Sequence, residues 1–255
     1  MLHEAISVQE VIDRECAHEF LKEATRLAAS EELVRIGAAL AAKSELFREH
    51  LSAEGIGALS EEDWSTLAAR MFFFRRKRAW RPGGEDFAAL RASIADLLHG
   101  AAPVRERFNT FVAARTELKP ALRFGLASEL LFYSQPERYW LWTHWIWDPA
   151  TRGGALRLVL QDDAELAGAD AGETYEQVGK ALASLQRVGA EDGFTYLGRG
   201  PFGVTVFLAC VYAVYMYTVF QMRISKEFNR VLPELPEFAQ RLLGVHDSRQ
   251  GQAHV

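Results

Sequence analysis

Apolar residues recur at helical spacing along most of this 255-residue chain. Within the first fifty residues, Leu33, Ile36 and Leu40 follow one another at intervals of three and four, which is the period of a helix with one buried face. The same spacing earlier in this stretch predicts a helix before it, and the Gly-Ile-Gly triplet at 55–57 ends the pattern. Residues 1–57 are therefore expected to form an acidic helical pair.

Capping residues and helix breakers divide the rest of the chain into further helices. Ser60 is a favourable N-cap, and the three acidic residues that follow it suit the first turn of a helix. The pairs Ser134/Glu137 and Thr174/Gln177 have the spacing of capping boxes. With the prolines and glycines, these signals predict helices over residues 61–80, 86–99, 103–118, 120–131, 137–147, 174–188, 203–230 and 236–243.

One stretch of the chain lacks this helical pattern. Leu156, Leu158 and Leu160 alternate with other side chains, which predicts a short strand, and Phe194–Leu197 between glycines is its candidate partner. The two would form one small two-stranded hairpin, and the chain contains no other strand signal of this kind.

The expected fold class is all-α, a single large helical bundle-like domain of about ten helices. The acidic pair is followed by a main helical part over residues 58–245 and by a polar tail at 246–255. We expect these parts to form one compact domain, because about half of the residues are apolar and a chain of this length can bury a sizeable core.

The longest uncharged stretch, Gly200–Met222, is the centre of this expected fold. It meets the length of about 20 apolar residues that a membrane-spanning helix needs. However, three tyrosines lie in its middle and C-terminal half, whereas tyrosines in a membrane span gather at its ends. We therefore expect a buried central helix over 203–230, with a single membrane span over 200–222 as the alternative.

Composition and cysteine content place the chain among intracellular proteins. Charged residues make up 25% of it, and Cys16 and Cys210 are its two cysteines, so neither a disulfide framework nor a cysteine zinc site is expected. The N-terminus carries acidic residues where a signal peptide would need a basic and then an apolar region. The expected location is cytoplasmic.

The net charge of −5 is unevenly distributed. Residues 1–69 carry a net charge of −8, residues 70–157 one of +7 and residues 158–255 one of −4. No acidic residue occurs from Trp64 through Gly84, where cationic side chains are interspersed with aromatic ones in a pattern that suits single-stranded nucleic acid. The same pattern would also suit an anionic lipid surface or an acidic partner protein. The simpler alternative is that the acidic helices pack beside this segment and neutralise it. The candidate nucleic-acid-binding residues are Arg70, Arg75, Arg76, Lys77, Arg78 and Arg81.

Four of the six tryptophans fall within residues 140–147. On the predicted helix, Trp140, His144 and Trp147 share one face, which would form an aromatic pocket for a planar or cationic ligand. The alternatives are a helix that is buried on several sides and an interfacial membrane belt. A tight turn before the long apolar helix would also bring an arginine to an electropositive helix N-terminus. The candidate ligand-binding residues are Trp140, Trp142, His144, Trp147 and Arg199.

Neither a catalytic nor a metal-binding site is predicted. The chain has no nucleophile elbow, P-loop or dinucleotide-binding glycine motif. One Glu-x-x-His pair, Glu15 and His18, lacks the second pair that a di-iron helical bundle needs. The turn at Gly55–Gly57 has the glycine pattern of a helix-hairpin-helix module, but acidic residues follow it and would repel phosphate. We therefore expect no catalytic residues, no cofactor and no metal, and lean against an enzyme.

Three functions remain as hypotheses. The first is a soluble intracellular accessory or adaptor protein that binds another macromolecule, most simply a protein. The second is a nucleic-acid-binding protein that uses the Arg70–Arg81 segment. The third is a ligand-binding protein or enzyme with an aromatic pocket of tryptophan and histidine.

Overall fold

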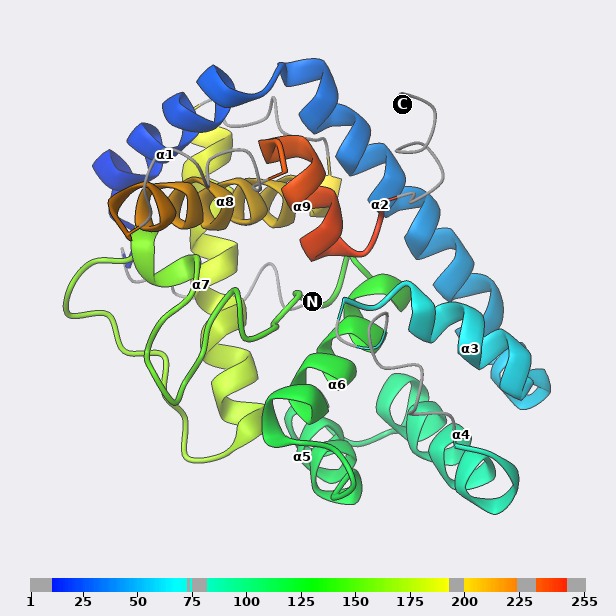
Figure 1. Cartoon of the computed structure of the whole chain (residues 1–255). Helices are drawn as coiled ribbons and strands as arrows, with labels where there is room; N and C mark the ends of the chain where they lie inside the picture. Colours follow the sequence, from blue (N-terminus) through cyan, green and yellow to red (C-terminus); the bar gives the residue numbers. More distant parts are fainter. Residues whose placement is uncertain (1–10, 73, 75–81, 193–199, 224–232, 247–255) are drawn as a thin grey trace, which may run out of the picture.

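The chain folds into α-helices joined by short 3₁₀ turns and loops (Figure 1). The structure, a computed structural model, describes residues 11–72, 74, 82–192, 200–223 and 233–246. Within these residues there are nine α-helices and no sheet, so the all-α prediction is confirmed. The helices are α1 (Arg14–Leu27), α2 (Ser30–Leu51), α3 (Glu61–Ala69), α4 (Gly84–His99), α5 (Val104–Ala114), α6 (Pro120–Ser134), α7 (Ala171–Glu191), α8 (Gly203–Arg223) and α9 (Leu235–Leu243).

Local signals fix most of the helix ends. The Ser60 side chain accepts a hydrogen bond from the Asp63 backbone, and the Asp63 carboxylate accepts one from the Ser60 backbone. This reciprocal capping satisfies two backbone donors at the start of α3. Gly100 ends α4 and Pro120 begins α6, as predicted. These ends were predictable because the capping groups lie within a few residues of the helix that they cap.

The helix α8 lies among helices from both ends of the chain. It packs against α1, α2, α7 and α9, and Figure 1 shows it passing beneath α1 and crossing α7. Its first half, Val206–Val214, is almost entirely buried. Helices α4, α5 and α6 form the other side of the molecule, where α6 bridges to α2 and α5 packs on α7.

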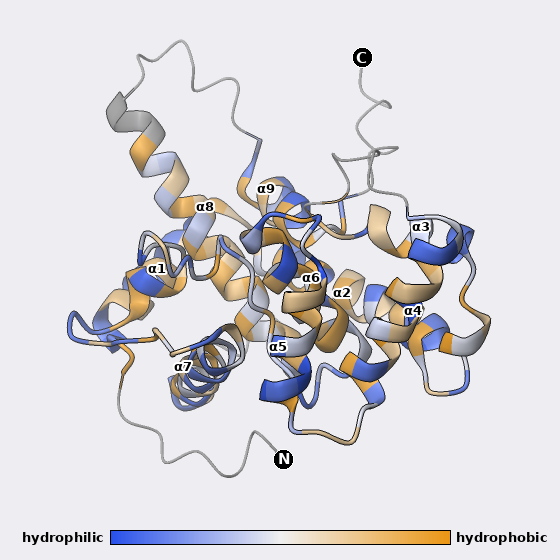
Figure 2. Ribbon diagram, turned by 90° about the horizontal axis from the view of Figure 1, so that it is seen from below, coloured by the Kyte–Doolittle hydropathy of each residue, from blue (hydrophilic) through white to orange (hydrophobic). Residues whose placement is uncertain are grey.

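The burial of α8 does not extend along its whole length. Tyr215 is 41% exposed, and Thr218 is also exposed. In Figure 2, this C-terminal part of α8 runs outward from the body of the molecule. The predicted continuation of the helix beyond Arg223 to residue 230 lies outside the described residues. By length and composition, Gly200–Val219 could cross a membrane, and it is the one such helix among the described residues, with 56% of its most apolar window buried.

The strand predicted at Leu156–Leu160 is wrong. Leu156–Val159 is a 3₁₀ helix, and Leu160 forms one isolated antiparallel bridge with Ile12. Residues three apart in a 3₁₀ helix lie on one face, so Leu156 and Val159 are both buried, whereas Leu158 is only half-buried and the leucine alternation does not mark a buried face. The proposed partner strand, Phe194–Leu197, lies outside the described residues.

Three further helix predictions are wrong at their boundaries. The helix predicted over residues 103–118 ends at Ala114. The helix that begins after Ser60 ends at Ala69 rather than near residue 80. The helix predicted from Thr174 begins three residues earlier, at Ala171, because Asp170 and not Thr174 is its N-cap. Thr174 lies inside the first turn, where its hydroxyl donates to the Asp170 carbonyl at 2.9 Å.

Candidate functional site

The tryptophan-rich segment Tyr139–Trp147 is an irregular loop rather than the predicted helix. The Ser134/Glu137 capping box does not form, because Ser134 is the last residue of α6 and Pro136 disfavours helical geometry at Gln135 before it. The four indoles are each at most 4% exposed. The shared helical face predicted for Trp140, His144 and Trp147 is therefore absent.

Two hydroxyl groups from neighbouring helices hold the loop in place. Ser128, on α6, accepts a hydrogen bond from the Trp142 backbone at 2.5 Å and donates one to the Trp140 carbonyl at 3.2 Å. The Tyr175 hydroxyl, on α7, lies 3.2 Å from the Trp140 nitrogen and 3.1 Å from its carbonyl oxygen. These contacts satisfy backbone groups that a helix would have satisfied internally.

The Trp142 indole stacks on rings of the protein itself. Its ring centroid lies 4.3 Å from that of Phe124 and 6.0 Å from that of Phe108, with interplanar angles of 8° and 19°. Phe108 stacks in turn on Tyr175 at 4.6 Å. Such offset stacks add stability beyond the area that they bury, so the loop contributes a large part of the core between α5, α6 and α7.

The loop leaves polar atoms for which the structure offers no partner. Trp147 Nε1 and Thr143 Oγ1 are buried and make no hydrogen bond within the described part of the chain, whereas Trp142 Nε1 donates to the Trp147 carbonyl at 2.9 Å. His144 is half-buried, and burial lowers the pKa of its imidazole, with Asp148 opposing that shift. A ligand-binding role for Trp140, Trp142, His144 and Trp147 stays a prediction, and these atoms are where a polar ligand would bond.

A buried ion pair that sequence analysis missed lies between α2 and α6. Lys43 Nζ is 3.6 Å from Glu129 Oε2, and neither side chain is more than 5% exposed. The ammonium group also lies 3.8 Å from the centroid of the Tyr133 ring, which suits a cation–π contact. Burial raises the pKa of Glu129, and the neighbouring Lys43 partly opposes that shift.

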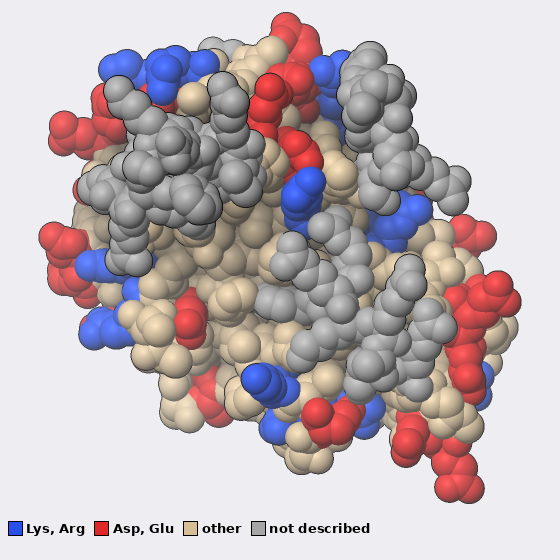
Figure 3. All heavy atoms as spheres, in the orientation of Figure 1, with Lys and Arg blue, Asp and Glu red and all other residues tan. Residues whose placement is uncertain are grey.

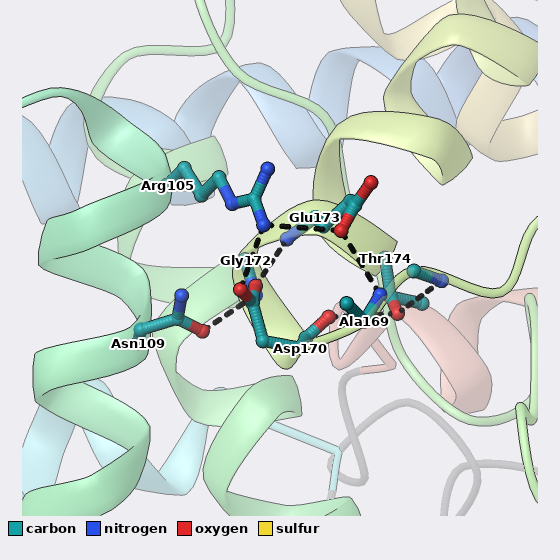
Figure 4. Close-up of polar contacts among 8 residues, drawn as sticks. Arg105, Asn109, Ala169, Asp170, Gly172, Glu173 and Thr174 are labelled. Carbon is teal, nitrogen blue, oxygen red and sulfur yellow. Dashed lines mark hydrogen bonds and ion pairs between the residues drawn. The ribbon is translucent and has the colours of Figure 1, made fainter.

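A second polar cluster joins α5 to the start of α7 (Figure 4). Arg105 Nη2 lies 2.8 Å from Asp170 Oδ2 and 3.0 Å from Glu173 Oε2. Asn109 accepts a hydrogen bond from the Gly172 backbone at 2.7 Å. The Arg105 guanidinium holds the pKa of Asp170 well below its usual range. Each of these groups has a partner within the cluster, so we interpret the cluster as a structural contact that fixes α7 against α5.

Of the six candidate nucleic-acid-binding residues, the structure describes the first, Arg70. Arg70 is exposed and forms the C-cap of α3, while Arg75, Arg76, Lys77, Arg78 and Arg81 lie outside the described residues, as does Arg199. The Gly55–Gly57 turn contains a short 3₁₀ helix, η1 (Ile56–Ala58), and the Gly57 carbonyl accepts a hydrogen bond from Arg91 at 3.2 Å. A nucleic-acid role for either feature stays a prediction.

The outer half of α8 presents a surface rich in aromatic groups. Tyr215 is the most exposed of the aromatic side chains described there, while Tyr212 and Tyr217 are half-buried against Phe238 of α9, with ring centroids 6.4 and 6.1 Å apart. Burial, followed by the charges of Glu234 and Glu237, raises the pKa of Tyr217 to about 12. This outer half of α8 therefore has an acidic margin.

The described residues contain no group of three or more His, Cys, Asp and Glu side chains arranged to hold a metal ion. In the Glu-x-x-His pair noted in the sequence, His18 contacts a carboxylate: its Nε2 lies 3.1 Å from Asp192 Oδ2 at the end of α7. Cys210 lies fully buried in α8, and Cys16 is exposed.

Comparison with protein-family models, curated proteins and solved structures gives no significant match to this chain.

Proposed function

We propose that this chain is a soluble, cytoplasmic helical adaptor that binds another protein through the outer half of α8. The observation that carries the proposal is the 41% exposure of Tyr215 on a helix that has no charged residue before Arg223. Exposed apolar side chains are common when they occur singly. Here the exposed tyrosine continues an apolar and aromatic helix surface, which is the composition that protein interfaces favour.

Charge favours a protein over an anionic lipid surface as the partner. Glu234 and Glu237 lie close enough to Tyr217 to raise its pKa, and negative charge there would be repelled by anionic headgroups. A partner that presents apolar side chains with a few lysines or arginines at the rim would match both features. Figure 3 shows the face that carries α9: charged side chains lie around its edge and over α9 itself, and the described surface between them is largely uncharged.

Affinity purification of tagged full-length chain from its native host tests this proposal. Tyr215→Glu places a charge in the proposed contact without disturbing the core, because the side chain is already exposed. Val34→Glu is the matched control, since Val34 is 49% exposed and lies on α2. We expect the same protein partner with the wild type and Val34→Glu, and at least about a tenfold loss with Tyr215→Glu, as for an interface hot spot. Equal recovery with all three would reject the proposal.

Nucleic-acid binding is the second candidate, supported by the acid-free stretch from Trp64 through Gly84. A mobility-shift titration with single-stranded oligonucleotides at two salt concentrations tests it. Arg75→Ala, Arg76→Ala and Arg78→Ala together should weaken binding and flatten its salt dependence by roughly one unit of slope per lost phosphate contact. No shift with the wild type at low salt would end this candidate.

A ligand-binding protein or enzyme built on the tryptophan loop is the third candidate and has the least support. The indoles pack on Phe124 and Phe108 and on the helices around them. A planar ligand would have to displace these rings or bond to the edge of the loop near His144. Quenching of tryptophan fluorescence by candidate ligands tests this third candidate. A ligand that binds at the loop should quench the wild type more strongly than His144→Ala.

A further inference from the structure

The C-terminus of α9 is capped by a lysine side chain from α2, which lies about 200 residues earlier in the chain. Lys43 Nζ donates to the carbonyl of Leu243, the final residue of α9, at 2.9 Å. The Tyr133 hydroxyl lies 3.5 Å from the same carbonyl oxygen. Carbonyl groups at a helix C-terminus are unpaired within the helix and carry partial negative charge, so an ammonium group suits them. The cap of α9 is therefore supplied from the core beneath it.

Docking of α9 takes charged groups out of water. The Lys43 side chain has no exposed surface, and that of its partner Glu129 is 5% exposed. Burying an ion costs several kcal/mol, and a pair separated by 3.6 Å recovers only part of this. The apolar contacts that α9 makes through Leu235, Ala239 and Leu242 must offset that cost. The free energy of docking α9 is therefore less favourable than its apolar contacts alone would give.

The helix itself adds little to its own stability. α9 has nine residues, fewer than the ~12–15 that an isolated helix needs to be even marginally stable in water. When α9 leaves its seat, the Leu243 carbonyl and the Lys43 ammonium group that contacts it regain water together, while Lys43 keeps Glu129 as its partner between α2 and α6. Opening therefore does not leave a charge stranded in an apolar core, which is what makes most buried ion pairs costly to break.

We propose that α9 is a displaceable latch, which opens as a unit while the other helices stay folded. The C-terminus of α9 docks on Lys43, which is paired with Glu129, and Gly244 ends the helix there. Opening withdraws Phe238 from Tyr212 and Tyr217, so that the aromatic surface of α8 extends beyond Tyr215. This consequence for partner binding rests on the proposed function, whereas the latch itself does not.

Native-state hydrogen exchange of the full chain, read by mass spectrometry, tests the latch. The amides of α9 should exchange at least about tenfold faster than those of α2 and α6, through an opening that urea affects only weakly, since a local opening exposes little surface. Exchange of α9 at the same rate and with the same urea dependence as α2 would overturn the proposal.

A double substitution decides what the buried pair does. Lys43→Met with Glu129→Leu removes both charges and keeps the side-chain volumes similar, and Tyr133 remains near the Leu243 carbonyl. If the pair weakens the seat, exchange of α9 should slow by about tenfold, as when apolar residues replace buried ion pairs. Faster exchange in the double variant would show that the pair holds α9 closed and would overturn the proposal.

Leu90→Ala is the matched control, because Leu90 is fully buried in α4. It should speed exchange of the amides that require global unfolding and leave the local exchange of α9 unchanged. All these measurements use the protein without a partner. A failed latch therefore leaves the partner-binding test with Tyr215→Glu intact, and a failed partner test leaves the latch intact.

Discussion

At the scale of single residues, the structure separates satisfied polar groups from unsatisfied ones in the tryptophan loop. Trp142 and Trp147 are equally buried, but among the described residues only the Trp142 indole finds a hydrogen-bond acceptor. A buried donor without a partner costs about 1–3 kcal/mol. The two indoles therefore form a natural pair for measuring what the unsatisfied N–H is worth.

Trp147→Phe should destabilise the protein less than Trp142→Phe, by about 1–3 kcal/mol, because only the second change removes a hydrogen bond. Both changes remove a similar volume, so the cavity cost largely cancels. Urea unfolding followed by circular dichroism measures the difference. An equal or larger loss for Trp147→Phe would mean that its N–H does have a partner in solution, such as an internal water or a ligand.

His144 should make the protein sensitive to mild acid. Burial lowers the pKa of its imidazole below the ordinary 6.5, so the unfolded chain binds a proton more readily than the folded chain. The stability that this group contributes is present above about pH 6.5 and is lost as the pH falls through the lower folded value. His144→Gln should therefore lose less stability than the wild type between about pH 6.5 and 5 in thermal melts. Parallel pH profiles for the two proteins would contradict this.

At the scale of elements, the helices that could be predicted from the sequence are those whose ends are fixed locally. Ser60 and Asp63 cap α3 within four residues, and the apolar spacing of α2 is visible in any window of the chain. The tryptophan loop could not be predicted in this way. Its backbone is satisfied by Ser128 and Tyr175, which lie 12 and 35 residues from Trp140, and no local pattern reveals such partners.

The Lys43–Glu129 pair was hidden for the same reason. Lys43 lies 86 residues before Glu129 and has the helical surroundings of an ordinary surface lysine. The packing of α2 on α6 and of α9 on α2 makes it a buried charge. The candidate binding residues in the Arg70–Arg81 segment, by contrast, depended on composition alone, and the structure describes only the first of them.

Gly244 ends α9 at a point where the chain passes close to the end of α3. Its φ of 68° is left-handed, and a Cβ placed there would lie 2.0 Å from the Arg70 carbonyl oxygen. Gly244→Ala should therefore destabilise the protein by clearly more than the ~1–2 kcal/mol of the left-handed conformation alone. The thermal midpoint and the exchange of α9 amides measure this effect.

Gly84→Ala provides the comparison for that substitution. Gly84 has a φ of 57°, and an added Cβ would meet nothing within 4 Å. It should therefore cost only the conformational penalty of about 1–2 kcal/mol. If the two substitutions cost the same, the close approach of α9 to the end of α3 does not hold in solution.

At the scale of the whole molecule, the question is whether α8 is the core of a soluble protein or a membrane span. The described part of α8 contacts α1, α2, α7 and α9, and Cys210 at its centre is completely buried. A helix that is apolar on all sides is expected at the centre of a large helical domain. Burial also raises the pKa of the Cys210 thiol to about 12, which keeps it in its unreactive protonated form.

These features predict a protein that purifies without detergent and whose two thiols differ sharply in reactivity. Under native conditions a thiol reagent should modify only Cys16, which is exposed, and in denaturant it should modify both cysteines. Labelling of Cys210 would then report global unfolding, because it requires α8 to leave the helices around it. Recovery of the full chain in an alkaline-washed membrane pellet, or native labelling of Cys210 as fast as that of Cys16, would show that α8 is not the centre of a soluble domain. Recovery in the membrane pellet would also indicate that the exposed side of α8 around Tyr215 contacts lipid rather than a protein partner.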